Sequence, residues 1–160
     1  MDATVKESLW NQFGASLDML ENAIVMCPDE QWGQVDFWYL AYHTLFWTDL
    51  YLFGSVEEFE PPAPYTLDEL DPDGVFPDHA YSRDEMRTYL AHCRTTCKGI
   101  IEGLTDERCE RQCSFNWGEA SYLELMMYNM RHVQHGAAQL NLLLRQSIDS
   151  APRWVAKAKA

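Results

Sequence analysis

Two histidines, His132 and His135, lie three residues apart in the segment 129–146, which reads NMRHVQHGAAQLNLLLRQ and is typical of a helix. Imidazoles this close together suggest a divalent-metal site. Paired ligands usually stand one helical turn apart, because residues i and i+4 share a face. The residue four positions after His132 is Gly136, which has no side chain to bind a metal. The segment is therefore either a metal-binding helix that lacks one ligand or a helix that uses its histidines differently.

The apolar seam of this helix fixes the direction of each side chain. The seam consists of residues at alternating spacings of three and four: Leu123, Met126, Met130, Val133, Ala137, Leu140 and Leu144. At about 100° per residue, His132 lies roughly 120° to one side of the seam, and Asn129 and Gly136 lie on the same flank. His135 points almost opposite the seam. We therefore predict that His132 faces a site and that His135 faces solvent or a partner subunit.

Four amphipathic helices are predicted to position these residues. Apolar spacing and capping signals place them at 4–26, 35–53, 82–103 and from 121 to before Pro152. The segment 105–120 is interpreted as a helical turn followed by irregular chain, and no strand pattern is found. Four successive helices predict an all-α fold, an antiparallel four-helix bundle.

A long connection, residues 55–81, joins the second and third of these helices. It contains five of the seven prolines and many acids, which we interpret as a solvated surface run, while its stretch TLDEL is compatible with one helical turn. The helices on either side need each other to bury their apolar stripes, so the chain is predicted to be a single domain, 1–160. Residues 151–160 form a C-terminal tail, in which Trp154 is expected to dock on the bundle.

Charge and hydropathy exclude several functional classes. The formal net charge of −13 argues against binding to nucleic acid or to an anionic membrane surface. The most apolar segment, residues 35–54, contains Asp36, His43 and Asp49, so we predict a buried helix rather than a membrane span. No secretory signal is recognised near the N-terminus. A cytoplasmic protein is therefore expected.

The five cysteines are an odd number, and we expect free thiols rather than a disulfide framework. They include two Cys-x3-Cys pairs, Cys93/Cys97 and Cys109/Cys113. Structural zinc sites more often use Cys-x2-Cys, and a pair one turn apart is a poor chelate by itself. We interpret these thiols as small buried apolar groups.

A further histidine, His43, shares one face of the helix 35–53 with Leu40, Trp47 and Leu50. In a helical bundle, metal sites are built from side chains of facing helices, so His43 could supply a ligand opposite His132. Two histidines alone leave a metal under-coordinated, since zinc usually has at least three protein ligands.

The stretches WYLAYHTLFWTDLYL and YNMRHVQHGAAQLN, with a weaker match at SAPRWVAKAK, make the chain resemble the DinB-like (DinB/YfiT-like) proteins. This family is related in fold to the bacillithiol transferases and the mycothiol-dependent maleylpyruvate isomerases. The resemblance spans nearly the whole chain in helix order. It implies the same four-helix bundle with a long crossover, and a homodimer formed through the bundle.

In such proteins, one histidine of the second long helix and a His-x3-His pair of the fourth typically bind a divalent metal, often zinc or nickel. The resemblance puts the first ligand on His43 and the second on His132. The third falls on Gly136, and His135 resembles the extra histidine that often precedes the third ligand.

Three hypotheses follow. In the first, the protein holds little or no metal and binds a small molecule between the helices of His43 and His132, with Gly136 enlarging the pocket. In the second, it is a metal-dependent thiol S-transferase or hydrolase, whose third ligand is His135, Asn129 or water. In the third, the histidines only pack, and the protein acts as a non-catalytic dimer or binds a partner. Whether it is an enzyme stays open.

Overall fold

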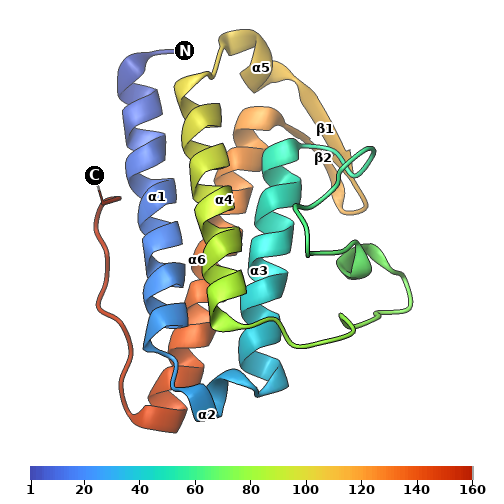
Figure 1. The fold of residues 1–160 in the computed structure, drawn as a ribbon. Helices are drawn as coiled ribbons and strands as arrows, with labels where there is room; N and C mark the ends of the chain where they lie inside the picture. The colour runs from blue at the N-terminus through green and yellow to red at the C-terminus, as the bar shows by residue number, and fades with distance from the viewer. Residues whose placement is uncertain (160) are drawn as a thin grey trace.

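The structure, a computed structural model, describes residues 1–159, and four long antiparallel helices form its body (Figure 1). They are α1 (Ala3–Met26), α3 (Val35–Phe53), α4 (Arg83–Glu102) and α6 (Tyr122–Ile148). Helices α1 and α3 each pack against both α4 and α6, so α1 stands diagonally opposite α3. The predicted all-α four-helix bundle is confirmed. Within residues 1–159, no helix combines the length and apolar character that a membrane crossing needs.

Short elements connect these helices. The turn after α1 contains α2 (Asp29–Trp32), and α5 (Asp106–Glu110) follows α4. The chain then forms an antiparallel hairpin of β1 (Gln112–Phe115) and β2 (Gly118–Ser121), where irregular chain was expected. The prediction of no strands was wrong, because four-residue strands are too short to show a clear alternation of apolar and polar residues.

The connection between α3 and α4 packs on α3 and contains the 3-10 turn η1 (Asp68–Leu70), within the stretch TLDEL where one turn was expected. Tyr65 stacks on Tyr89 of α4 with ring centroids 4.0 Å apart, and Tyr81 lies 4.8 Å from Tyr42 of α3. All four tyrosines are buried. This aromatic cluster fixes the connection against the bundle and so determines where its acids lie.

The C-terminal tail runs back along α1 (Figure 1), but Trp154 does not anchor it. Trp154 is 70% exposed, which contradicts the expectation that it docks on the bundle. The backbone holds the tail instead: Ala158 donates to the carbonyl of Asn11, and the N–H of Lys159 donates to the buried carboxylate of Asp18, 2.8 Å away. These anchors are main-chain groups, which have no signature in the sequence.

The closest approach of α3 and α6 is at Gly136, which packs against Thr44. A Cβ atom added at Gly136 would lie 2.7 Å from Cγ2 and 3.0 Å from Cβ of Thr44, and closer still to its Oγ1. The sequence-based hypothesis that Gly136 enlarges a pocket was therefore wrong. Thr44 fills the space, and Gly136 allows the two helices to touch.

We predict that Gly136→Ala lowers the free energy of unfolding by about 1–3 kcal/mol, because the added methyl group overpacks the α3–α6 contact. Gly99→Ala is the matched control, since a Cβ there meets nothing within 4 Å and the helix interior gains about 0.5–1 kcal/mol from alanine. Urea unfolding measures both. Equal effects of Gly136→Ala and Gly99→Ala on the free energy of unfolding would contradict the close contact between Gly136 and Thr44. When Thr44→Ala is combined with Gly136→Ala, the loss of unfolding free energy should be smaller.

Candidate functional site

His43 lies on the side of α3 that the connection 55–81 covers. Its Nδ1 atom lies 2.6 Å from Oε2 of Glu69, and its side chain is 40% exposed while that of Glu69 is 4% exposed. An ionised carboxylate only accepts hydrogen bonds, so Nδ1 of His43 carries the proton and donates it. In the neutral ring, Nε2 then keeps its lone pair. His43 is thus a proton acceptor whose orientation is fixed by a buried carboxylate.

Glu69 belongs to η1, and its interpretation as part of a solvated acidic run was wrong. Its Oε2 also accepts a hydrogen bond of 2.8 Å from Nε1 of Trp47. Burial raises the pKa of Glu69, but interactions led by the hydrogen bond from His43 outweigh burial and hold the pKa below its ordinary value of 4.5. The only sequence signal for its position was the adjacent Leu70, which packs against the core.

His132 of α6 lies beside His43, with ring centroids 5.8 Å apart. Its Nε2 lies 3.2 Å from the carbonyl oxygen of Thr44, which can only accept, so Nε2 carries a proton and Nδ1 is the free nitrogen. Burial, followed by the charge of His43, lowers the pKa of His132 to about 4. His132 is therefore a neutral imidazole at pH 7.

The other residues of the predicted flank also face α3. Asn129 is buried and donates from Nδ2 to the carbonyl of Thr48, 2.9 Å away. Gly136 is buried against Thr44, whereas His135 is exposed. The predicted directions of Asn129, His132, Gly136 and His135 are thus confirmed. The structure brings the rings of His43 and His132 together, whereas His135 is exposed on the outer side of α6 and shares with His132 only a hollow on that side.

A groove of about 450 Å³ opens between α3 and α6 beside His43. Its walls consist of Asp36, Tyr39, Leu40, His43, Gln139, Leu142 and Leu143. A separate hollow of about 510 Å³, which includes Arg131 and His135, adjoins His132. The groove size is within the range of small-molecule sites, and its lining combines apolar side chains with few polar groups. We call it the α3–α6 groove.

Comparison with protein families matches residues 12–140 to the DinB superfamily. The chain belongs to the DinB superfamily. No curated protein and no solved structure matches the chain. The family assignment agrees with the helical bundle and with the resemblance found in the sequence.

The metal positions implied by the DinB resemblance can be tested against these contacts. Nδ1 of His43 and Nε2 of His132 are occupied by Glu69 and by the Thr44 carbonyl, which leaves one nitrogen on each ring. The third position, Gly136, is filled by Thr44. In the described part of the chain, no group of three or more His, Cys, Asp or Glu is arranged to hold a metal ion. These residues do not fit a three-ligand metal centre.

A second carboxylate–imidazole pair in this DinB chain joins α3 to α4. Asp49 is buried, and its Oδ1 lies 3.2 Å from Nε2 of His92 while its Oδ2 accepts from the hydroxyl of Tyr89. Burial raises the pKa of Asp49, and His92 opposes this. The pair lies on another face of α3 than the α3–α6 groove, and it fastens two helices.

All five cysteines are buried free thiols, as expected from the sequence. Burial raises the pKa of Cys27 to about 11, and it also raises the pKa values of Cys93 and Cys97. Thiols that stay protonated are poor nucleophiles and poor metal ligands. Cys27, Cys93 and Cys97 therefore pack rather than react.

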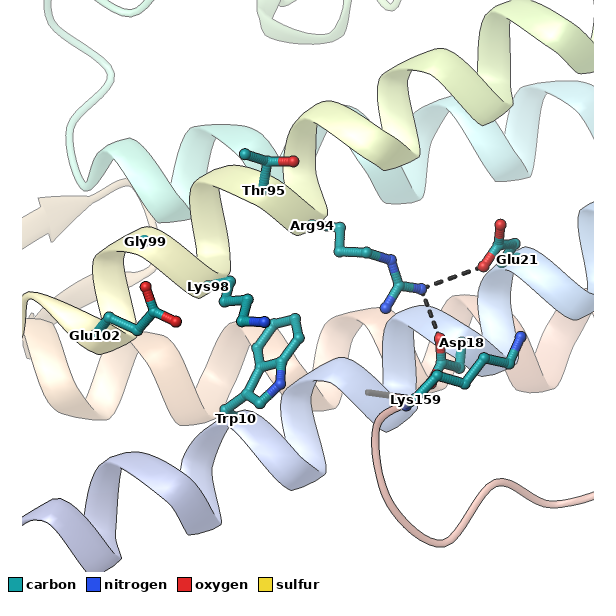
Figure 2. Close-up of a pocket in the computed structure, with 9 residues that line it drawn as sticks. All are labelled: Trp10, Asp18, Glu21, Arg94, Thr95, Lys98, Gly99, Glu102 and Lys159. Carbon is teal, nitrogen blue, oxygen red and sulfur yellow. Dashed lines mark hydrogen bonds and ion pairs between the residues drawn. The ribbon is translucent and has the colours of Figure 1, made fainter.

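A polar groove of about 620 Å³ lies between α1 and α4, on the opposite side of the bundle (Figure 2). Arg94 donates to Asp18 at 2.7 Å and to Glu21 at 3.3 Å. The ammonium group of Lys98 lies 5.5 Å from the ring centroid of Trp10. The charges of this groove largely satisfy each other, and Asp18 also anchors the tail. We assign the groove a structural role.

The neutral His132 makes stability depend on pH. Its pKa is about 4 in the folded chain and 6.5 in a solvated one, so the unfolded chain takes up a proton first and stability is lost as pH falls from about 6.5 towards 4. Between pH 7.5 and 5 we expect His132 to account for about 2 kcal/mol of lost unfolding free energy. His132→Gln should remove this part of the pH dependence, measured by urea unfolding at each pH. His135→Gln, at an exposed position, should keep it. If the unfolding free energy of the two variants depended on pH in the same way, the prediction would be contradicted.

Proposed function

We propose that this DinB protein binds a small, largely apolar molecule in the α3–α6 groove and that His43 accepts a proton from it. The observation that carries the proposal is the buried Glu69 carboxylate on Nδ1 of His43, at the wall of an apolar groove. A carboxylate placed in this way orients the imidazole and stabilises the imidazolium that forms when Nε2 takes a proton.

The chemistry is that of a general base. Leu40, Leu142 and Leu143 hold the apolar body of the ligand, and a ligand O–H or S–H group beside Nε2 of His43 gives up its proton. No step requires a protein nucleophile. The metal-dependent thiol transferase or hydrolase is the alternative, and it would need His135, Asn129 or water as its third ligand, although Asn129 donates to the Thr48 carbonyl and His135 is exposed.

Binding is tested with N-phenyl-1-naphthylamine, a neutral apolar dye that fluoresces when it leaves water. We expect one dye molecule per chain with a micromolar dissociation constant. Leu142→Glu should weaken binding by about tenfold or more, because it places a carboxylate in the apolar wall. Val25→Glu adds the same charge at an exposed apolar position of α1 and should leave binding unchanged. Equal losses in both variants would contradict the α3–α6 groove as the site.

The role of His43 is tested by ¹⁵N spectra of its imidazole. Nδ1 should be protonated and Nε2 free, and Glu69→Ala should release Nδ1, whereas Glu60→Ala, at an exposed acid of the same connection, should not. Titration with Zn²⁺ and Ni²⁺ in the same spectra tests the alternative. Stoichiometric binding that shifts both His43 and His132 would contradict the metal-free proposal.

We also propose that the protein forms a homodimer, as the resemblance to the DinB-like proteins implies, and that the outer face of α6 contributes to the contact. Met127 is 48% and Leu142 is 55% exposed, at opposite ends of that face.

Sedimentation velocity tests the dimer. We expect the wild-type chain to sediment as a dimer and Met127→Glu to sediment as a monomer, because a charge would be buried in the contact. Met127 does not line the α3–α6 groove, so dye binding should survive the substitution. Val25→Glu should stay dimeric. A wild-type monomer at tens of micromolar would overturn the dimer without affecting the groove.

A further inference from the structure

The charges beside the α3–α6 groove are of one sign. Among the residues that the structure describes, its lining includes Asp36 and no lysine or arginine. Asp36 is exposed and lies in the first turn of α3. Within residues 1–159, Asp36 has no ion-pair partner. The carboxylate therefore stands uncompensated at the end of the groove.

A second carboxylate lies behind the wall. Glu69 lies 2.6 Å from His43, and its side chain is only 4% exposed. Asp36 and His43 are seven residues apart on α3, which is two helical turns on one face and a rise of roughly 10 Å. The groove thus carries a negative charge near each end and apolar side chains between them.

A smaller hollow of about 240 Å³ shares Asp36 with the groove and likewise has no lysine or arginine among its described lining residues. Two larger hollows differ in this respect. The one beside His132 contains Arg131, and the groove between α1 and α4 contains Arg94, Lys98 and Lys159. The net charge of −13 adds a long-range field that attracts cations and repels anions. The charge around Asp36 therefore suits a positively charged ligand, and the α3–α6 groove adds the apolar wall of Leu40, Leu142 and Leu143.

We infer that the ligand of the α3–α6 groove is an amphiphilic primary amine, whose ammonium group pairs with Asp36 and whose apolar chain lies on Leu40, Leu142 and Leu143. Tyr39 lines the same groove and packs against Phe76, with ring centroids 4.4 Å apart, which fixes the position of its ring in the wall. An anionic ligand, such as a thiol that carries carboxylates, would meet like charge there. The inference rests on the proposed function and adds the class of its ligand.

The test is displacement of the bound dye at pH 7.5 by three probes that share one chain: octylamine, octanol and octanoate, each below its micelle-forming concentration. Octylamine is a cation at this pH and octanoate an anion. We expect octylamine to displace the dye at about threefold lower concentration than octanol, because an ion pair with an exposed carboxylate contributes roughly that factor. Octanoate should be the weakest, and added salt should reduce the differences.

Asp36→Asn is the decisive variant. It should remove most of the difference between the displacing concentrations of octylamine and octanol, while the displacing concentration of octanol stays unchanged. Asp84→Asn, at an exposed acid in the first turn of α4, is the matched control and should keep this difference. Equal displacing concentrations of octylamine and octanoate would overturn the inference that the ligand is an amine. So would an Asp36→Asn variant in which octylamine displaces the dye at the same concentration, relative to octanol, as in the wild type. Failure of all three probes would instead contradict the proposed function, and the inference with it.

Discussion

The contact between Thr44 and Gly136 is the constraint on which the candidate site depends. Because Gly136 lacks a side chain, α3 and α6 approach closely enough for His132 to donate to the Thr44 carbonyl and for Asn129 to donate to the Thr48 carbonyl. The same approach places the ring of His132 beside His43. Without it, the two imidazoles would belong to separate surfaces. The contact that assembles the histidine pair also fills the position where a third metal ligand would stand.

Glu69 adds to this arrangement from outside the bundle. A buried carboxylate is costly unless its oxygens are paired, and the hydrogen bonds from His43 and Trp47 offset that cost. The tyrosine cluster around Tyr65 and Tyr81 makes the pairing possible, since it holds the connection in one conformation against the helices. The helices supply the imidazoles, and the connection supplies the charge that orients one of them.

The parts of the structure that depend on neighbouring residues were predictable from the sequence. Apolar periodicity located the four long helices, and Ser82 with Glu85 forms the capping box expected at the start of α4. The helical wheel also gave correct directions for His132 and His135. These features follow from rotation per residue and from local hydrogen bonds, which the sequence encodes directly.

Features that depend on long-range partners were missed or misjudged. Nothing near Glu69 in the sequence indicates that its carboxylate will form a hydrogen bond with His43, which lies 26 residues earlier. Gly136 was correctly singled out, but a glycine does not reveal whether its space is empty or filled by a residue such as Thr44. The tail anchor was missed because it is the backbone N–H of Lys159 on Asp18. The metal assignment was inferred from family likeness, and only contacts in space could test its fit.

The burial of every cysteine has a consequence for how the protein opens. A thiol reagent reaches a buried sulfur only when the surrounding segment unfolds, so its rate of reaction follows local opening. Cys27 follows α1, Cys93 and Cys97 lie within α4, and Cys109 and Cys113 lie in α5 and β1. The five thiols therefore act as natural reporters of fluctuation at separate places in the bundle. For the same reason, any thiol that takes part in chemistry at the α3–α6 groove must come from the ligand.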